Sequence, residues 1–230
     1  MRRLLSVVVS VYNEEEALAQ FYQVTEGILN TISWDYELVF VNDGSRDQSL
    51  PILNHLADSN PKVKVVSFSR NFGHEAAMIA GIDYSQGDGI ICMDADLQHP
   101  PETLISMYHL WEQGWEVIEG VKKSRGTESL LHKESAGFFY GIMSKATGVN
   151  MQNASDFKMM DRKAVNSILS MPERNMFFRA TSSWVGFKTT YVEFEVRDRE
   201  AGQSKWSTWS LIKYAFTNIC LLYTSDAADE

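Results

Sequence analysis

Short apolar runs alternate with helical patterns through the first half of the chain, and this alternation limits the fold more than any other feature. The runs are continuous and rich in β-branched residues, as is typical of parallel strands buried on both faces. Strands are predicted at residues 4–12, 36–41, 63–68, 89–93 and 116–119. Helices are predicted directly after Asn13 and at residues 48–59, 74–85 and 101–113. This order predicts a doubly wound, mostly parallel α/β sheet with right-handed crossovers.

The second half of the chain has a less regular pattern. A polar loop is expected at residues 120–129, followed by a helix at 130–147, a short strand at 157–161, a helix at 162–170 and a strand at 187–196. A last helix, at residues 205–219, carries tryptophans on its apolar face and lysines at its edges. That pattern suits an amphipathic helix lying on a membrane, although packing on the protein's own core would give the same pattern.

Acidic side chains follow three of the predicted strands at the point where each strand ends. They are Glu14, Asp43, Asp94 and Asp96. Ligands of open α/β sheets bind outside the carboxyl ends of the strands. The four carboxylates are therefore expected to contribute to one binding site.

Asp94-Ala95-Asp96 is the most informative of these segments because two carboxylates follow a buried apolar strand one residue apart. Like charges held so close repel each other, and burial raises the cost. A divalent metal carrying a phosphorylated ligand would offset that repulsion, since Mg²⁺ favours one or two carboxylates together with phosphate oxygens. A solvated turn is the alternative, and the sequence flanking this segment favours the metal.

The bulk composition fits one large α/β domain, alone or with an appendage. The chain has 230 residues, 44% of them hydrophobic, and a formal net charge of −9. An acidic balance argues against nucleic-acid binding. Two cysteines cannot form a disulfide framework. The apolar N-terminus is interpreted as a first strand rather than a signal peptide. The sequence contains no run of 18 or more apolar residues, so no membrane span is predicted in it.

The last eleven residues, 220–230, resemble the translation of a transposase-type sequencing adapter. We expect that the coding sequence was cut near Ile219, so that residues 220–230 are a non-native tail and the native C-terminus is not part of this chain. The predicted organisation is then one domain at residues 1–204 and the amphipathic helix at residues 205–219.

Three segments resemble the catalytic domain of family-two glycosyltransferases, which has the nucleotide-diphospho-sugar transferase (GT-A) fold. They are Val9-Ser10-Val11-Tyr12-Asn13-Glu14-Glu15, Val41-Asn42-Asp43-Gly44-Ser45-Arg46-Asp47 and Asp94-Ala95-Asp96-Leu97-Gln98-His99-Pro100-Pro101-Glu102. Three motifs in order and at suitable spacing make this resemblance specific.

Three further segments resemble the polyprenyl-phosphate glycosyltransferases, the relatives of dolichol-phosphate mannose synthase. They are Ser69-Arg70-Asn71-Phe72-Gly73-His74-Glu75-Ala76-Ala77, Ser155-Asp156-Phe157-Lys158 and Arg199-Glu200-Ala201-Gly202-Gln203-Ser204-Lys205-Trp206. The chain departs from the usual family pattern at Val11, His99 and Trp206. None of these departures removes a carboxylate. The resemblance implies that residues 1–204 are the catalytic domain and that residues 205–219 begin a membrane region missing from this chain, because members of this group usually continue into transmembrane helices after the last motif.

The resemblance implies a donor site for a nucleoside-diphosphate sugar and a divalent metal, Mg²⁺ or Mn²⁺. Asp96 would be the direct metal ligand, and Asp94 would bind the ribose side of the nucleotide or hold the metal's hydration shell. The other residues implied in nucleotide-sugar binding are Tyr12, Glu14, Asp43, Arg70, Ala95 and Gln98.

Several of these residues also have a purely structural interpretation. Asp43 would accept hydrogen bonds from the base, but it could equally form an Asx-turn. Glu14 could instead favour the helix dipole, together with its neighbours in the first turn of a helix capped by Asn13. Arg70 is assigned near the nucleotide, while His74 is left between that role and simply beginning a helix.

Cations are expected where two phosphorylated substrates meet, because they offset the repulsion between them. The candidates for this role are Arg125, Arg197, Arg199 and Lys205. A solvated surface charge is the alternative for each of them, and the resemblance favours the functional role for Arg199 and Lys205, which lie within the family motif. Asp156 occupies the position of a catalytic base in related enzymes. A phosphate monoester is largely ionised at neutral pH, with a second pKa of about 6, so it needs little help from a base. Asp156 could instead orient the acceptor or a basic partner, or be a turn residue at a strand edge.

Together these features predict an inverting glycosyltransferase that moves a hexose, with UDP-glucose favoured as donor, to a polyprenyl phosphate at the cytoplasmic face of the cell membrane. A soluble or cell-surface saccharide acceptor is the alternative, and Asp156 would then be the base. A non-catalytic nucleotide-binding or membrane-docked module is the third hypothesis. Assembly into a homo-oligomer is left open.

Overall fold

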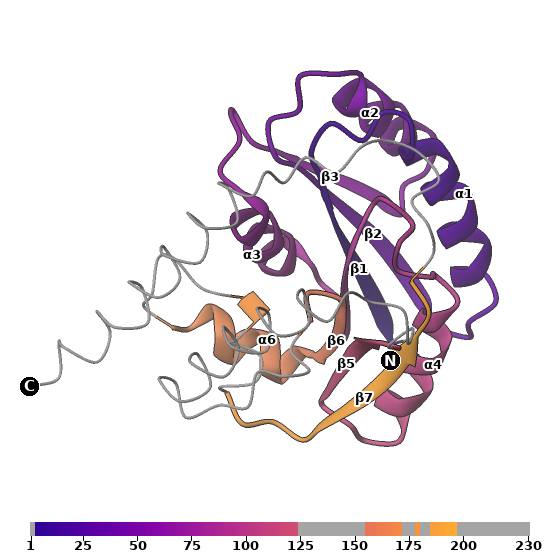
Figure 1. Cartoon of the computed structure of the whole chain (residues 1–230), viewed down its shortest axis with the longest axis vertical. Coiled ribbons are helices and arrows are strands. Elements are labelled where there is room, and N and C mark those ends of the chain that lie inside the picture. Colours follow the sequence, from indigo (N-terminus) through magenta and orange to yellow (C-terminus); the bar gives the residue numbers. More distant parts are fainter. Residues whose placement is uncertain (1–2, 124–154, 172–177, 180–184, 197–230) are drawn as a thin grey trace, which may run out of the picture.

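The structure is a computed structural model that describes residues 3–123, 155–171, 178–179 and 185–196 (Figure 1). Within these residues seven strands form one sheet. The strands are β1 (Leu4–Val11), β2 (Asp35–Asn42), β3 (Val63–Ser67), β4 (Gly89–Asp94), β5 (Val117–Lys122), β6 (Lys158–Asp161) and β7 (Thr189–Phe194). The helices are α1 (Leu18–Leu29), α2 (Ser49–Ser59), α3 (His74–Tyr84), α4 (Thr103–Glu112) and α6 (Arg162–Leu169).

The strand order within the sheet is β3-β2-β1-β4-β6-β5-β7. The chain winds outward from β1 through β2 to β3 and then returns to place β4 on the other side of β1, with all four strands parallel. β6 is antiparallel to both β4 and β5, and β7 is parallel to β5. The sheet thus changes direction of winding between β1 and β4, and ligands of such sheets bind at this point.

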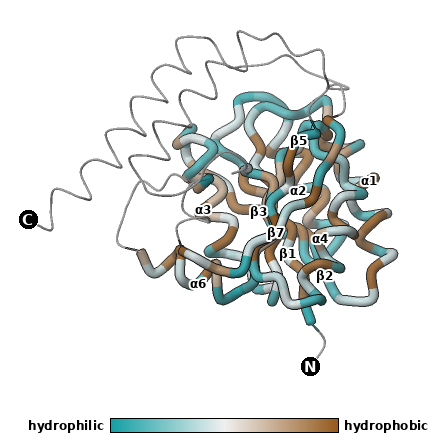
Figure 2. Tube along the Cα trace, turned by 60° about the horizontal axis from the view of Figure 1, so that its bottom comes forward, coloured by the Kyte–Doolittle hydropathy of each residue, from teal (hydrophilic) through white to brown (hydrophobic). Residues whose placement is uncertain are grey.

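Helices cover both faces of the sheet, which explains why the strands are continuous apolar runs. Val7 and Val9 of β1 belong to a buried cluster with side chains of α1, α2 and α4, whereas Val8 belongs to a cluster with α3 and α6 (Figure 1). Hydrophobic stretches accordingly gather in the middle of the body in Figure 2. Cys92 and Met93 of β4 are fully buried, as expected for core residues.

The first helix differs from its prediction, because it begins at Leu18 rather than after Asn13. Asn13 has a left-handed backbone (φ 53°), and its side-chain oxygen accepts a hydrogen bond from the Arg46 N–H at 2.7 Å. The N–H of Glu14 donates to the Ser49 hydroxyl at 2.9 Å. The loop after β1 is therefore fastened to the loop after β2, so the interpretation of Asn13 as a cap is wrong. Glu14 precedes α1 and does not occupy its first turn.

The other predicted strands and helices that fall on described residues are present, with boundaries shifted by up to three residues. The helices predicted at residues 130–147 and 205–219 and the tail at 220–230 lie outside the described residues, as does the predicted domain boundary at residue 204. Across the described ranges, no helix is both long enough and apolar enough to cross a membrane.

The buried carboxylate of Glu37, near the amino ends of the central strands, is expected to make the stability of the fold depend on pH. Glu37 of β2 accepts hydrogen bonds from the Ser6 hydroxyl and the Gln86 N–H and pairs with Lys64 of β3. Burial alone would raise the pKa of Glu37, but these partners outweigh it and lower the pKa below its ordinary value.

The variant Glu37→Gln is expected to lower the free energy of unfolding at pH 7 by about 1–3 kcal/mol, since hydrogen bonds to a charged group are lost. A lowered folded-state pKa gives stability that is fully present above the unfolded pKa, about 4.3 for glutamate, and is lost as the pH falls further. Urea unfolding from pH 7 to pH 3 should therefore show the difference from wild type shrinking in acid. The exposed Glu195→Gln is the control, and a difference independent of pH would contradict the assignment.

Candidate active site

Asp94 and Asp96 lie at the carboxyl end of β4, beside the point where the direction of winding changes. Asp94 is paired in register with Ser10 of β1, and the Ser10 hydroxyl donates to its carboxylate at 3.2 Å. Asp96 is buried, and one of its carboxylate oxygens accepts the Gln98 N–H at 3.1 Å. Leu97, which lies between Asp96 and Gln98 in the sequence, has a left-handed backbone (φ 59°). Such strain in a non-glycine residue is typical of functional sites.

Asp43 anchors the segment after β3 to the end of β2. Its two carboxylate oxygens accept the N–H groups of Phe72 and Gly73 at 2.6 and 3.0 Å. Burial nevertheless outweighs these bonds and raises the pKa of Asp43 above its ordinary value. The Asx-type hydrogen bond expected here is made instead by Asn42, whose side-chain oxygen accepts the Ser45 N–H at 3.2 Å.

Gly44 allows these two segments to approach closely. A Cβ at this position, where φ is +64°, would lie 2.3 Å from the Arg70 carbonyl carbon. Arg70 itself is exposed at this edge, and its guanidinium lies 4.5 Å from the centre of the Phe72 ring. The predicted nucleotide residues Asp43 and Arg70 are thus brought into one assembly, with Asp43 supporting the segment that carries Arg70.

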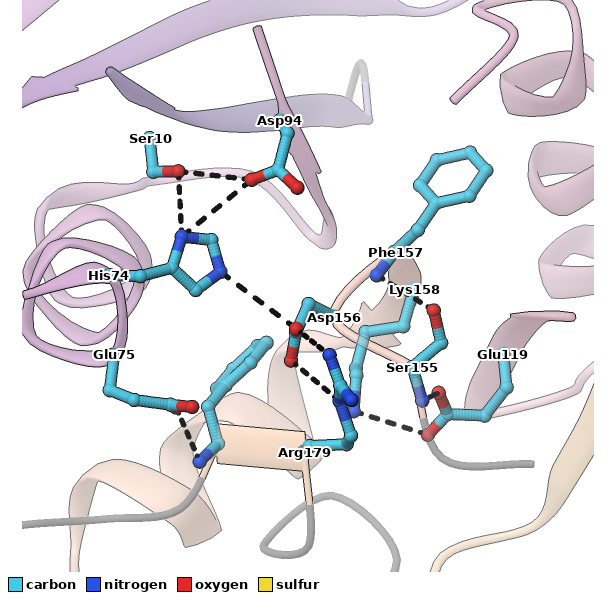
Figure 3. Close-up of polar contacts among 11 residues, drawn as sticks. Ser10, His74, Glu75, Asp94, Glu119, Ser155, Asp156, Phe157, Lys158 and Arg179 are labelled. Carbon is cyan, nitrogen blue, oxygen red and sulfur yellow. Dashed lines mark hydrogen bonds and ion pairs between the residues drawn. The ribbon is translucent and has the colours of Figure 1, made fainter. Parts of the chain in front are cut away.

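His74, the first residue of α3, lies between Asp94 and Asp156 (Figure 3). Its Nδ1 is 3.0 Å from the Ser10 hydroxyl and 3.6 Å from an Asp94 carboxylate oxygen, and its Nε2 is 4.0 Å from an Asp156 carboxylate oxygen. Burial alone would lower the pKa of His74, but the charges of Asp94, Asp156 and Glu75 outweigh it and raise the pKa.

Asp156 precedes β6 and pairs with Arg179 through both carboxylate oxygens (Figure 3). Burial alone would raise the pKa of Asp156, but Arg179, with His74 and Lys158, holds the pKa below its ordinary value. A carboxylate held in its charged form by an arginine is a weak base. One predicted role of Asp156 was to orient a basic partner, and Arg179 is a basic residue paired with it.

A buried ion pair supports the segment that carries Asp156. Lys158 Nζ is 3.3 Å from a Glu119 carboxylate oxygen, and the two side chains are 0% and 1% exposed. The other Glu119 oxygen accepts the Ser155 N–H at 3.1 Å. Lys158 also lies 4.9 Å from the Phe178 ring centre, and the Phe178 N–H donates to Glu75. Glu119 therefore holds residues on both sides of Asp156, through the backbone of Ser155 and the side chain of Lys158.

The structure brings most of the predicted site residues to one edge of the sheet. At the carboxyl ends of β1–β4, or just after them, lie Tyr12, Glu14, Asp43, Arg70, Asp94, Ala95, Asp96 and Gln98. Asp156 lies beside Asp94, with His74 between them. The predicted cations Arg125, Arg197, Arg199 and Lys205 lie outside the described residues. The sequence did not single out Ser10, Glu119 or Arg179. Ser10 lies inside an apolar strand, and Glu119 and Arg179 are far in sequence from the residues they bind.

The carboxylate oxygens at the end of β4 are suitable ligands for a hard divalent cation. Asp94 and Asp96 offer carboxylate oxygens one residue apart, and the Asp94 side chain is 36% exposed. In the part of the chain that the structure describes, no three His, Cys, Asp or Glu side chains form a metal-binding group. A site with two carboxylates is the kind that Mg²⁺ completes with water and phosphate oxygens, so these residues fit a metal held jointly with a diphosphate.

The chain belongs to glycosyl transferase family 2, whose family model matches residues 6–169. It is therefore a glycosyltransferase. It is 41% identical over 215 residues to an uncharacterized glycosyltransferase, YkcC, of Bacillus subtilis, covering 93% of this chain and 67% of that protein. It is also 40% identical to a prophage bactoprenol glucosyl transferase homolog of Escherichia coli (94% and 71% covered) and 38% identical to the bactoprenol glucosyl transferase of Shigella phage SfV (94% and 70% covered).

Solved structures show that the fold is GT-A. Glucosyl-3-phosphoglycerate synthase from Mycobacterium tuberculosis, crystallised with Mn²⁺, UDP and glucosyl-3-phosphoglycerate, matches with a TM-score of 0.66 and 16% identity. That match covers 96% of this chain and 79% of the synthase. Residues 1–349 of Staphylococcus aureus TarS match with a TM-score of 0.58 and 19% identity, covering 84% of this chain and 58% of TarS.

Proposed function

We propose that this glycosyltransferase moves glucose from a nucleoside-diphosphate donor, UDP-glucose, to a polyprenyl phosphate. The resemblance to bactoprenol glucosyl transferases over 94% of the chain supports the acceptor and the sugar. The Asp94 and Asp96 carboxylates at the ligand-binding edge of the sheet support a donor with a diphosphate. UDP bound to the structural neighbour supports uracil as the base of the donor.

The chemistry of Asp156 is the observation that favours a phosphate acceptor over a saccharide. A saccharide hydroxyl must lose its proton as it attacks, and a base with a lowered pKa and an arginine partner is poorly suited to remove it. The phosphate monoester of a polyprenol is already ionised for the most part. In the proposed reaction a phosphate oxygen attacks the anomeric carbon, and the bond from that carbon to the nucleotide diphosphate breaks with inversion.

The residues at the end of β4 would act on the leaving group. Asp96 would hold Mg²⁺ or Mn²⁺ directly, and Asp94 would support it or the ribose. The metal, when bound, would neutralise negative charge on the departing nucleotide. The acceptor side would be formed by Asp156 with Arg179, together with the predicted cations Arg125, Arg199 and Lys205.

A polyprenyl acceptor is held in a membrane, so we place the reaction at the membrane surface, on the cytoplasmic face where nucleotide sugars are available. The apolar face expected at residues 205–219 would provide a contact with the membrane. Homo-oligomer formation stays an open prediction, and so does the non-native origin of residues 220–230.

Transfer of radiolabelled glucose tests the proposal. The chain is incubated in liposomes with labelled UDP-glucose and Mn²⁺ or Mg²⁺, with polyprenyl phosphate in one arm and a soluble saccharide in the other. We expect solvent-extractable label only with the lipid phosphate and a loss of label when the metal is chelated. Label that enters the saccharide instead, with an acidic limb of the pH–rate profile removed by Asp156→Asn, would replace the proposal with the soluble-acceptor reaction.

A further inference from the structure

His74 occupies a position that joins the donor side of the site to the acceptor side. The preceding residue, Gly73, donates its N–H to Asp43, which fixes the start of α3 at the edge of the sheet. From there the imidazole reaches the Ser10–Asp94 pair with Nδ1 and faces Asp156 with Nε2 (Figure 3). One ring thus lies between two carboxylates from different parts of the sequence.

The sheet itself brings these two carboxylates into opposition. The antiparallel pairing of β4 with β6 ends at Cys92 and Lys158. Continuing that register by two residues on each strand places Asp94 opposite Asp156. Two like charges in a partly buried site repel each other, and Arg179 offsets this repulsion by pairing with Asp156. A polar group between the two carboxylates would offset it further and help both of them to point into the site.

The Nε2 atom of His74 is buried and has no hydrogen-bond partner among the described residues. A buried polar atom without a partner costs about 1–3 kcal/mol. Its distance of 4.0 Å to the Asp156 oxygen is too long for a hydrogen bond. A carboxylate oxygen can accept more than one donor, so Asp156 can take a bond from His74 while keeping Arg179. A closure of about 1 Å would bring this pair to hydrogen-bond distance.

We infer that His74 is a positioning residue that couples the donor-side carboxylate Asp94 to the acceptor-side carboxylate Asp156. This inference rests on the proposed function for the identity of the two sides. In it, Nδ1 orients Asp94 through the Ser10 hydroxyl, and Nε2 holds Asp156 when the acceptor phosphate enters. His74 contacts neither the sugar nor the phosphate in this role.

Two substitutions separate the two contacts. His74→Asn retains a side-chain amide near the position of Nδ1 and lacks the group toward Asp156. His74→Gln retains an amide near the position of Nε2 and lacks the group toward Ser10 and Asp94. Each variant thus removes one half of the proposed coupling and preserves the other.

The two variants are expected to show opposite patterns of loss. His74→Gln should raise the Kd for UDP with Mn²⁺, measured by calorimetry, by about tenfold and leave the KM for polyprenyl phosphate near wild type; the size is typical of coupling between sites. His74→Asn should raise the KM for polyprenyl phosphate by about tenfold and leave the Kd for UDP near wild type. Adding His74→Asn to Asp156→Asn should produce no further rise in that KM.

The same pair of substitutions at His55, which is exposed on α2, provides the control. Equal losses in both His74 variants, in step with a lower melting temperature, would assign His74 to folding alone and overturn the inference. If the wild type transfers no glucose, the proposed acceptor fails. The UDP titrations still decide the inference then: a raised Kd in His74→Gln alone supports it, and equal values in the two variants contradict it. A chain that neither binds UDP nor transfers glucose would remove both proposals.

Discussion

Asp96→Asn is expected to lower the turnover of glucose transfer by about 10³-fold, because a metal that neutralises charge on the leaving diphosphate contributes several kcal/mol to the transition state. The amide keeps the size of the side chain and can still accept the Gln98 N–H, so the loop after β4 should keep its form. Initial rates at saturating donor and acceptor, together with the Kd for Mn²⁺ in the presence of UDP, measure the effect.

Asp58→Asn is the matched control, since Asp58 is exposed in the last turn of α2, which leads to the amino end of β3. It should leave turnover and metal affinity as they are in the wild type. Normal turnover in Asp96→Asn would refute its role as metal ligand. Loss of turnover with a normal Kd for Mn²⁺ would show that other residues bind the metal. Asp96 would then be needed for the reaction without being a metal ligand.

Lys158→Met is expected to lower the free energy of unfolding by about 3–5 kcal/mol, because removing one partner of a buried ion pair leaves an uncompensated charge. That charge is the carboxylate of Glu119, which is 1% exposed. The double variant Lys158→Met with Glu119→Gln should recover much of the loss, since neither charge then stays buried. Urea unfolding at pH 7 measures all three proteins.

The pair formed by Lys123 and Glu195 provides the comparison at the surface. Its side chains are 61% and 69% exposed. Lys123→Met should therefore cost less than about 1 kcal/mol. If Lys158→Met costs no more than Lys123→Met, the buried pair does not hold the segment around Asp156.

The order and type of the elements could be predicted from the sequence because the strands are buried on both faces. A strand such as β4 then appears as a run of apolar residues, and its carboxyl end is marked by the first aspartate, Asp94. The ends of parallel strands meet at one edge of the sheet, so the shared position of Asp43, Asp94 and Asp96 followed from the strand pattern alone.

The local chemistry of the site was harder to predict because it depends on contacts between distant residues. Asn13 carries a good capping side chain, but its side-chain oxygen accepts the Arg46 N–H and its own N–H donates to the Ser45 hydroxyl, so Asn13 is held by the neighbouring loop and α1 begins later. His74 gave no clear signal, since a histidine at a helix start has no single role. Its partners Asp94 and Asp156 are brought to it only by the pairing of β4 with β6.

The carboxylate of Asp43 accepts hydrogen bonds from the backbone of Phe72 and Gly73, while Arg70 lies exposed on the same segment. This division between a supporting residue and an exposed one has a consequence for how related enzymes diversify. An exchange at Asp43 would release the segment that also places His74. A change of nucleotide preference during evolution would therefore be expected to arise in exposed side chains such as Arg70, while the aspartate beneath them is retained across enzymes with different donors.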